Sequence, residues 1–140
     1  MAEFFTYSAE DVIVIIGGIS VSGFADGSAV KIKRNTPTFK SKVGMKGDVT
    51  RVKSSDRTGL LTLTLKQSSN INQAFSALAL ADEATGDGVF PILVKSPNNF
   101  TIAVAEHAYI QEWPEIDFSD DESNIEWQIA VADLTLNVGA

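Results

Sequence analysis

The segment LTLTLK at residues 61–66 decides the fold class, because leucine alternates with a polar residue along its whole length. Successive side chains of a β-strand point to opposite faces, so the three leucines would share one face while Thr62 and Thr64 share the other. A buried leucine face and a threonine face that tolerates water are typical of a sheet covered on one side. The segment therefore predicts an antiparallel β-sheet.

The same period of two continues on both sides of this segment. The other predicted strands lie at residues 12–16, 19–24, 30–33, 49–53, 89–95, 100–105, 109–113, 125–132 and 134–136. Gly17-Gly18 and Asp26-Gly27 are typical of tight turns, and Pro91 favours an edge or a bulge for its strand. The set predicts a mainly β protein with a small antiparallel β-barrel or sandwich.

One flanking helix is predicted, over residues 70–83. Its apolar side chains recur with the period of a helix that covers an apolar surface, at Ile71, Phe75 and Leu78. Asn70, followed three residues later by Gln73, fits a capping box at the start of this helix. Gly86 is expected to end it.

Residues 35–48 interrupt the strand pattern. The stretch NTPTFKSKVGMKGD contains a proline, two glycines and three lysines, and it shows neither a helical nor a strand period across its length. A structureless connection of this length is unusual inside a small domain and is commonly functional. We therefore predict a long inter-strand loop there.

Composition limits the function classes. The 140 residues predict a single domain over 1–140, and the formal net charge is −7. Cysteine is absent, which excludes disulfides, cysteine zinc sites and a cysteine nucleophile. The longest apolar run, residues 12–16, is far below the ~20 residues of a membrane helix, and no secretory signal is visible. We expect a cytosolic product that does not contact a membrane.

No catalytic, cofactor or metal site is predicted. His107 beside Glu106 resembles a base with its orienting carboxylate, but neighbours in a strand point to opposite faces, which favours a surface histidine. The acids at 117–122 lack the spacing and the glycine of a calcium loop. Residues 44–48 do not match a phosphate-binding loop. Trp113 and Trp127 are more typical of core or interface anchors than of a ligand pocket.

Charge is segregated along the chain. Nine of the eleven Lys and Arg residues lie within 31–57, where two acids leave a net charge of +7. Eight acids and no Lys or Arg lie within 106–126, for a net charge of −8. Two solvated faces would explain this, and so would self-assembly, since a basic and an acidic surface on one body are complementary head to tail. Nucleic-acid binding by the basic stretch is disfavoured by the overall acidity and by the lack of interleaved aromatic residues.

Several segments, taken together and in order, resemble one known family. They are VIIGG at 14–18 with the residues through SGFADG at 22–27, KSSDRTG at 53–59 leading into the Leu/Thr strand, the helix at 70–82, and GVFPILVK at 88–95. This ordered set resembles the tail tube (inner tube) proteins of contractile-tailed bacteriophages over residues 8–136. No single motif within it is catalytic.

The resemblance implies a β-barrel or sandwich with one helix, related in fold to the type VI secretion tube protein. It implies a structural virion protein, made in the host cytoplasm, that forms homohexameric rings stacked into a hollow tube. DNA would cross the lumen without specific binding, a sheath protein would surround the tube, and initiator or baseplate and terminator proteins would bound its ends. The virion tail would be its location.

The resemblance also implies assembly residues. The loop at 35–48 would dock on the adjacent ring through Lys40, Lys42 and Lys46, and its electrostatic partner would be the acidic stretch at 112–122. The acids expected in this contact are Glu115, Asp117, Asp120 and Asp121. Thr62 and Thr64 would form part of the polar inner wall. The alternative function is a monomeric small β-barrel that binds a ligand or a protein.

Overall fold

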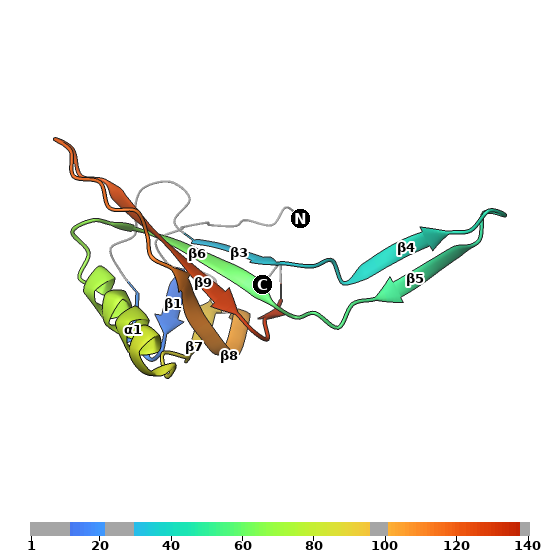
Figure 1. The fold of residues 1–140 in the computed structure, drawn as a ribbon, viewed down its shortest axis with the longest axis horizontal. Helices are drawn as coiled ribbons and strands as arrows, with labels where there is room; N and C mark the ends of the chain where they lie inside the picture. Colours follow the sequence, from blue (N-terminus) through green and yellow to red (C-terminus); the bar gives the residue numbers. More distant parts are fainter. Residues whose placement is uncertain (1–11, 22–29, 96–100, 138–140) are drawn as a thin grey trace, which may run out of the picture.

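A computed structural model describes residues 12–21, 30–95 and 101–137 of the chain (Figure 1). Its elements are β1 (Ile13–Ile16), β2 (Ile19–Ser20), β3 (Val30–Arg34), β4 (Phe39–Val43), β5 (Val49–Lys53), β6 (Gly59–Lys66), α1 (Ile71–Thr85), β7 (Phe90–Lys95), β8 (Thr101–Glu112), β9 (Asn124–Val131) and β10 (Thr135–Leu136). The predicted Asp26-Gly27 turn and the start of the strand at residue 100 lie outside the described residues. No described helix has the length and apolar character needed to span a bilayer.

The strands form one large sheet and one separate hairpin. The large sheet has the order β2-β1-β7-β8-β9-β6-β3, with β10 added on β8, and β4 and β5 pair only with each other. Every recorded pairing is antiparallel. The mainly β prediction with one helix is confirmed. Within the described residues the large sheet does not close into a barrel, because its end strands β2 and β3 do not pair with each other.

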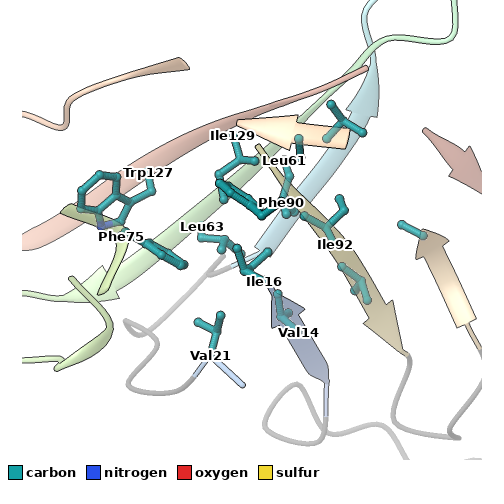
Figure 2. Close-up of a cluster of buried hydrophobic side chains, with 14 of the residues drawn as sticks. Val14, Ile16, Val21, Leu61, Leu63, Phe75, Phe90, Ile92, Trp127 and Ile129 are labelled. Atoms are coloured by element: carbon teal, nitrogen blue, oxygen red, sulfur yellow. The ribbon is translucent and has the colours of Figure 1, made fainter. Parts of the chain in front are cut away.

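One face of the large sheet holds the core. Leu61, Leu63 and Leu65 of β6 are fully buried, whereas Thr62 and Thr64 between them are half-buried on the other face. In Figure 2 the side chains of β1 and β7 lie opposite those of β6 and β9 and meet in one cluster. The strand at 61–66 therefore has the orientation that its alternation predicted.

The helix packs on this core through Phe75 and Ala79. The Phe75 ring meets Trp127 of β9 edge to face, with 5.5 Å between the ring centroids. The predicted helix is confirmed, and Gly86 ends it with a left-handed backbone (φ 77°) and an N–H that donates to the Asp82 carbonyl. The predicted capping box is wrong, because the Asn70 side chain makes no cap hydrogen bond. The Ser69 hydroxyl accepts the Ile71 N–H instead.

Pro91 occupies a bulge, one of the two positions expected for it. The pairing of β7 with β8 shifts register between Phe90 and Ile92, and β7 lies inside the sheet between β1 and β8. The Pro91 carbonyl accepts the N–H of Gly17 at 2.8 Å. Residues 109–112, predicted as part of a separate strand, continue β8 without a break.

The predicted structureless stretch 35–48 is wrong in its local structure. Residues 39–43 form β4, which pairs with β5 in a register from Phe39 opposite Lys53 to Val43 opposite Val49. Every residue of both strands is exposed. The strand period was hidden because neither face is buried, so the sequence carries no apolar alternation at this place. The long inter-strand segment is therefore a hairpin, and Figure 1 shows it standing away from the body.

Candidate assembly surfaces

The hairpin at residues 39–53, here called the arm, has two different faces. Residues directly opposite each other in an antiparallel pair lie on the same face. One face, here the Phe39 face, therefore carries Phe39, Ser41 and Val43 from β4 and Val49, Arg51 and Lys53 from β5. The other, here the Lys40 face, carries Lys40 and Lys42 with Thr50 and Val52. Lys46 lies in the exposed turn between the strands.

The arm is basic and exposes apolar side chains. Five Lys and Arg residues and one acid give it a net charge of +4. The Val43 side chain is 69% exposed, and Met45 in the turn is fully exposed. On the Phe39 face the Arg51 guanidinium lies 4.2 Å from the centre of the Phe39 ring. The arm contributes no residue to the core cluster, and its apolar side chains have no cover within the described part of the subunit.

A set of polar residues, here called the clasp, holds the base of the arm. The Asp56 carboxylate accepts the Thr36 hydroxyl at 2.6 Å on one oxygen, and the Thr58 hydroxyl at 2.6 Å and N–H at 2.9 Å on the other. The Ser54 N–H donates to the Thr38 carbonyl at 2.7 Å. Sequence reasoning missed the clasp, although SSDRT at 54–58 has the Ser/Asp/Thr spacing at which side chains accept backbone N–H groups two residues on.

The clasp is expected to respond to acid. The hydroxyl of Thr36, followed by the hydroxyl and N–H of Thr58, lowers the pKa of Asp56 from 3.8 to about 2. Because the folded pKa lies below the unfolded one, the clasp contributes stability above about pH 4 and loses it as the pH falls toward 2. We predict an Asp56 titration midpoint near pH 2 by carboxyl-carbon NMR. The Thr36→Val/Thr58→Val variant should raise this midpoint toward 3.8, and an unchanged midpoint would contradict the assignment.

The loop at residues 113–123, here called the acidic loop, joins β8 to β9. It carries five acids and no basic residue. Its return to the body is anchored on the β6–α1 connection, where the Ser68 N–H donates to the Glu122 carboxylate at 2.8 Å and the Ser123 N–H donates to the Gln67 side chain. The hydrogen bonds from Ser68 lower the pKa of Glu122. Glu122 is therefore a structural anchor, while the acids before it project into solvent.

Aromatic packing fixes the start of the acidic loop. The Trp113 ring lies 6.2 Å from Trp127, centroid to centroid, and its indole N–H donates to the Glu83 carboxylate of α1. Beside it α1 and β8 border an open hollow of about 250 Å³, with Asp82, Glu83 and Glu112 on its wall. Trp127 is a core anchor, as expected, and the half-exposed Trp113 ties the loop to the helix.

The two charged surfaces lie at opposite ends of the molecule. In Figure 1 the arm forms one end of the long axis, and the orange trace between β8 and β9 forms the other end. All seven residues predicted for the assembly contact are exposed, with Lys40, Lys42 and Lys46 on the arm and Glu115, Asp117, Asp120 and Asp121 on the acidic loop. The structure does not bring the two sets together within one subunit.

Thr62 and Thr64 lie on the face of the large sheet that is turned away from the core. Thr62 is directly opposite Lys31 of β3 and Gln128 of β9, and Thr64 is opposite Glu126. This face is therefore polar and carries both signs of charge around the two threonines. Whether it lines a channel stays a prediction.

His107 is a surface residue, but it and Glu106 do not lie on opposite faces of β8 as neighbours in a regular strand would. Glu106 and His107 are both exposed, because these two residues of β8 lie opposite the single residue Pro91 in the bulge. His107 Nδ1 lies 3.7 Å from the Asp133 carboxylate. The three side chains are close enough to share an ion, yet all are open to solvent, where such groupings are common without one. This grouping is therefore not evidence of a metal site.

Two comparisons with known sequences give bacteriophage proteins. A family model for the bacteriophage PhiTE tail tube protein matches residues 4–139. Structural protein ORF10 of Pseudomonas phage KPP10 is 29% identical, over 96% of this chain and 82% of that protein.

Solved structures share the fold. A chain of the virion of a native gene transfer agent particle has a TM-score of 0.64 at 14% identity, covering 95% of this chain and all of that one. A chain of the sheath-tube complex of the PVC extracellular contractile injection system, in its extended state, has a TM-score of 0.61 at 11% identity, covering 95% and 92%. With the family match spanning nearly the whole chain, the protein belongs to the bacteriophage PhiTE tail tube family and is a structural protein of the virion tail.

Proposed function

We propose that the protein assembles into homohexameric rings that stack head to tail and form the hollow inner tube of the tail. The observation that carries this is the placement of the basic arm and the acidic loop at opposite ends of one subunit. Complementary surfaces that cannot meet within a subunit join successive subunits, and a heterologous contact of this kind closes into rings or continues as a filament.

The open sheet supports ring formation. Within the described residues its end strands β2 and β3 each keep one edge without a strand partner. An unpaired edge can pair with a strand of another chain. Such pairing promotes aggregation of a monomer, but it can join the subunits of an assembly. In the ring, Thr62, Thr64 and their neighbours on β3 and β9 would form the polar inner wall, and DNA would pass along it without specific binding.

The partners follow from this arrangement. A sheath protein would surround the tube, as in the sheath-tube complex that shares the fold. Initiator or baseplate proteins would cover one end of the tube and a terminator the other. The tube terminating cap of the anti-feeding prophage also shares the fold. In this proposal the protein has a structural role and no enzymatic activity.

Negative-stain electron microscopy of the concentrated protein, left for days, tests the proposal. Rings or hollow tubes with sixfold symmetry are the expected result. Particles that stay dispersed at every protein concentration and ionic strength would contradict it and favour the monomeric binding module.

Reversing the arm charges gives a sharper prediction. The Lys40→Glu/Lys42→Glu/Lys46→Glu variant should fold but lose tubes, since like charges would meet across the contact. Adding Glu115→Lys, Asp117→Lys and Asp120→Lys should restore them. Wild-type tubes should also weaken as salt rises above about 0.15 M, where charges more than about 8 Å apart are screened. A triple variant that forms normal tubes would remove the electrostatic part of the proposal.

A further inference from the structure

The acidic loop begins with a segment that is not helical and pairs with no strand in the described part of the chain. Residues 113–119 contain no turn or bend, and the chain bends only at Asp120 and Asp121. Acids and large apolar residues alternate along it in the order Glu115, Ile116, Asp117, Phe118. In an extended chain this order places the two acids on one face and the two apolar side chains on the other.

The apolar side chains of this segment have no cover within the subunit. Ile116 is 64% exposed and Phe118 is 85% exposed. A solvated acidic loop needs neither residue, so their presence indicates a contact with another molecule. The acids alone would not indicate more than a solvated loop.

One backbone edge of the segment is also free. The carbonyl of Asp117 accepts the side-chain N–H of Gln67, at 3.4 Å, which directs that edge toward the body. Neighbouring residues of an extended chain direct their N–H and C=O groups to the opposite edge. Within the described part of the chain, the backbone groups of Ile116 and Phe118 have no hydrogen-bond partner.

The arm has the complementary edge. It is a two-stranded sheet whose strands pair only with each other, and such a hairpin is marginal in water by itself. On β4 the Lys40 face carries only lysines, whereas the Phe39 face carries Phe39, Ser41 and Val43 without a charge. On β5 the Phe39 face mixes Val49 with Arg51 and Lys53. The alternation of β4 therefore matches that of residues 115–118. Its lysines match the two acids, and its uncharged Phe39 face matches the two apolar side chains.

We propose that residues 115–118 of one copy add as a third strand to the free edge of β4 in a second copy. Glu115 and Asp117 would lie beside the lysines of the Lys40 face, and Ile116 and Phe118 beside the Phe39 face. Backbone hydrogen bonds would hold the added strand on β4. The two rows of side chains would fix the register of this pairing, because a slip by one residue puts acids on the apolar face. The inference rests on the proposed function, since it specifies the contact between stacked subunits.

Cysteine pairs test which faces meet. The chain has no cysteine, so every disulfide formed reports an introduced pair. Same-face pairs are Ser41→Cys with Ile116→Cys or Phe118→Cys, and Lys42→Cys with Asp117→Cys. The matched opposite-face controls are Ser41→Cys with Asp117→Cys, and Lys42→Cys with Phe118→Cys. A disulfide requires Cβ atoms about 3.5–4.5 Å apart, which side chains on opposite faces of a sheet do not reach.

Mild oxidation of assembled protein is expected to give covalent ladders of dimers, trimers and longer chains on denaturing gels from the same-face pairs. The opposite-face controls should stay monomeric. Ladders from both sets, or from neither, in samples that contain tubes by electron microscopy would overturn strand addition and leave the proposed function intact. A wild-type protein that forms no tubes, with no ladder from any pair, would overturn both.

Discussion

Removal of the arm is expected to abolish tube formation while the body of the subunit stays folded. The cut should remove residues 39–53 and join Thr38 to Ser54 through Asn-Gly, because the Ser54 N–H already donates to the Thr38 carbonyl at 2.7 Å. This pair holds the ends at hairpin distance, and Asn-Gly favours the two-residue turn that connects antiparallel strands. The clasp around Asp56 remains complete in this variant.

The physical reason for an intact body is that the arm adds nothing to the core. Each residue of the arm is exposed, and the core cluster draws only on other elements. We expect the free energy of unfolding, measured with urea and far-UV circular dichroism, to change by less than about 1 kcal/mol. Tubes should be absent by negative-stain microscopy at concentrations where the wild type forms them. Normal tubes from this variant would contradict the assignment of the arm to assembly.

The Trp127→Ala substitution is expected to be the most destabilising single change. Trp127 is 2% exposed, packs edge to face on Phe75 and donates its indole N–H to the Asn72 side chain at 2.9 Å. Truncation of a buried aromatic residue leaves a cavity and costs about 3–5 kcal/mol. For a domain of this size the melting temperature should fall by roughly 10–20 °C.

The contacts of Asn72 add to this cost. Its side-chain amide also donates to the carbonyls of Lys66 and Gln67, so it joins the end of β6 to α1 and, through Trp127, to β9. The matched control is Phe118→Ala, which removes an aromatic ring that is 85% exposed and should change the unfolding free energy by less than about 0.5 kcal/mol. A loss below 1 kcal/mol for Trp127→Ala, measured by urea unfolding, would contradict this account of the core.

Periodicity predicted the body of the protein well because burial imposes it. The leucines at 61, 63 and 65 alternate because one face of β6 is the core, and the spacing of Ile71, Phe75 and Leu78 follows from α1 covering that core. The arm has no such constraint. Both faces of β4 and β5 are exposed, so burial imposes no alternation on their sequence, and the pattern predicts a loop where the structure has a hairpin.

Local hydrogen bonds were harder to predict than elements. Asn70 and Gln73 fit a capping box by spacing, yet the bond at that place is made by Ser69, because spacing does not fix which of several polar residues turns toward the helix. The clasp unites Thr36 with residues 20 positions further on, a pairing that depends on the two stems of the arm lying side by side.

The sequence by itself determined the class of the protein, since the alternation at 61–66 and the segregated charges at 31–57 and 106–126 are properties of the chain. Only the tertiary structure decided where those charges lie. The pairing of β4 with β5 projects five of the nine basic residues from one end, and the acidic loop between β8 and β9 carries five of the eight acids at the other. The order of residues along a chain does not carry this information, because strand pairing between distant segments sets the direction in which each connection leaves the sheet.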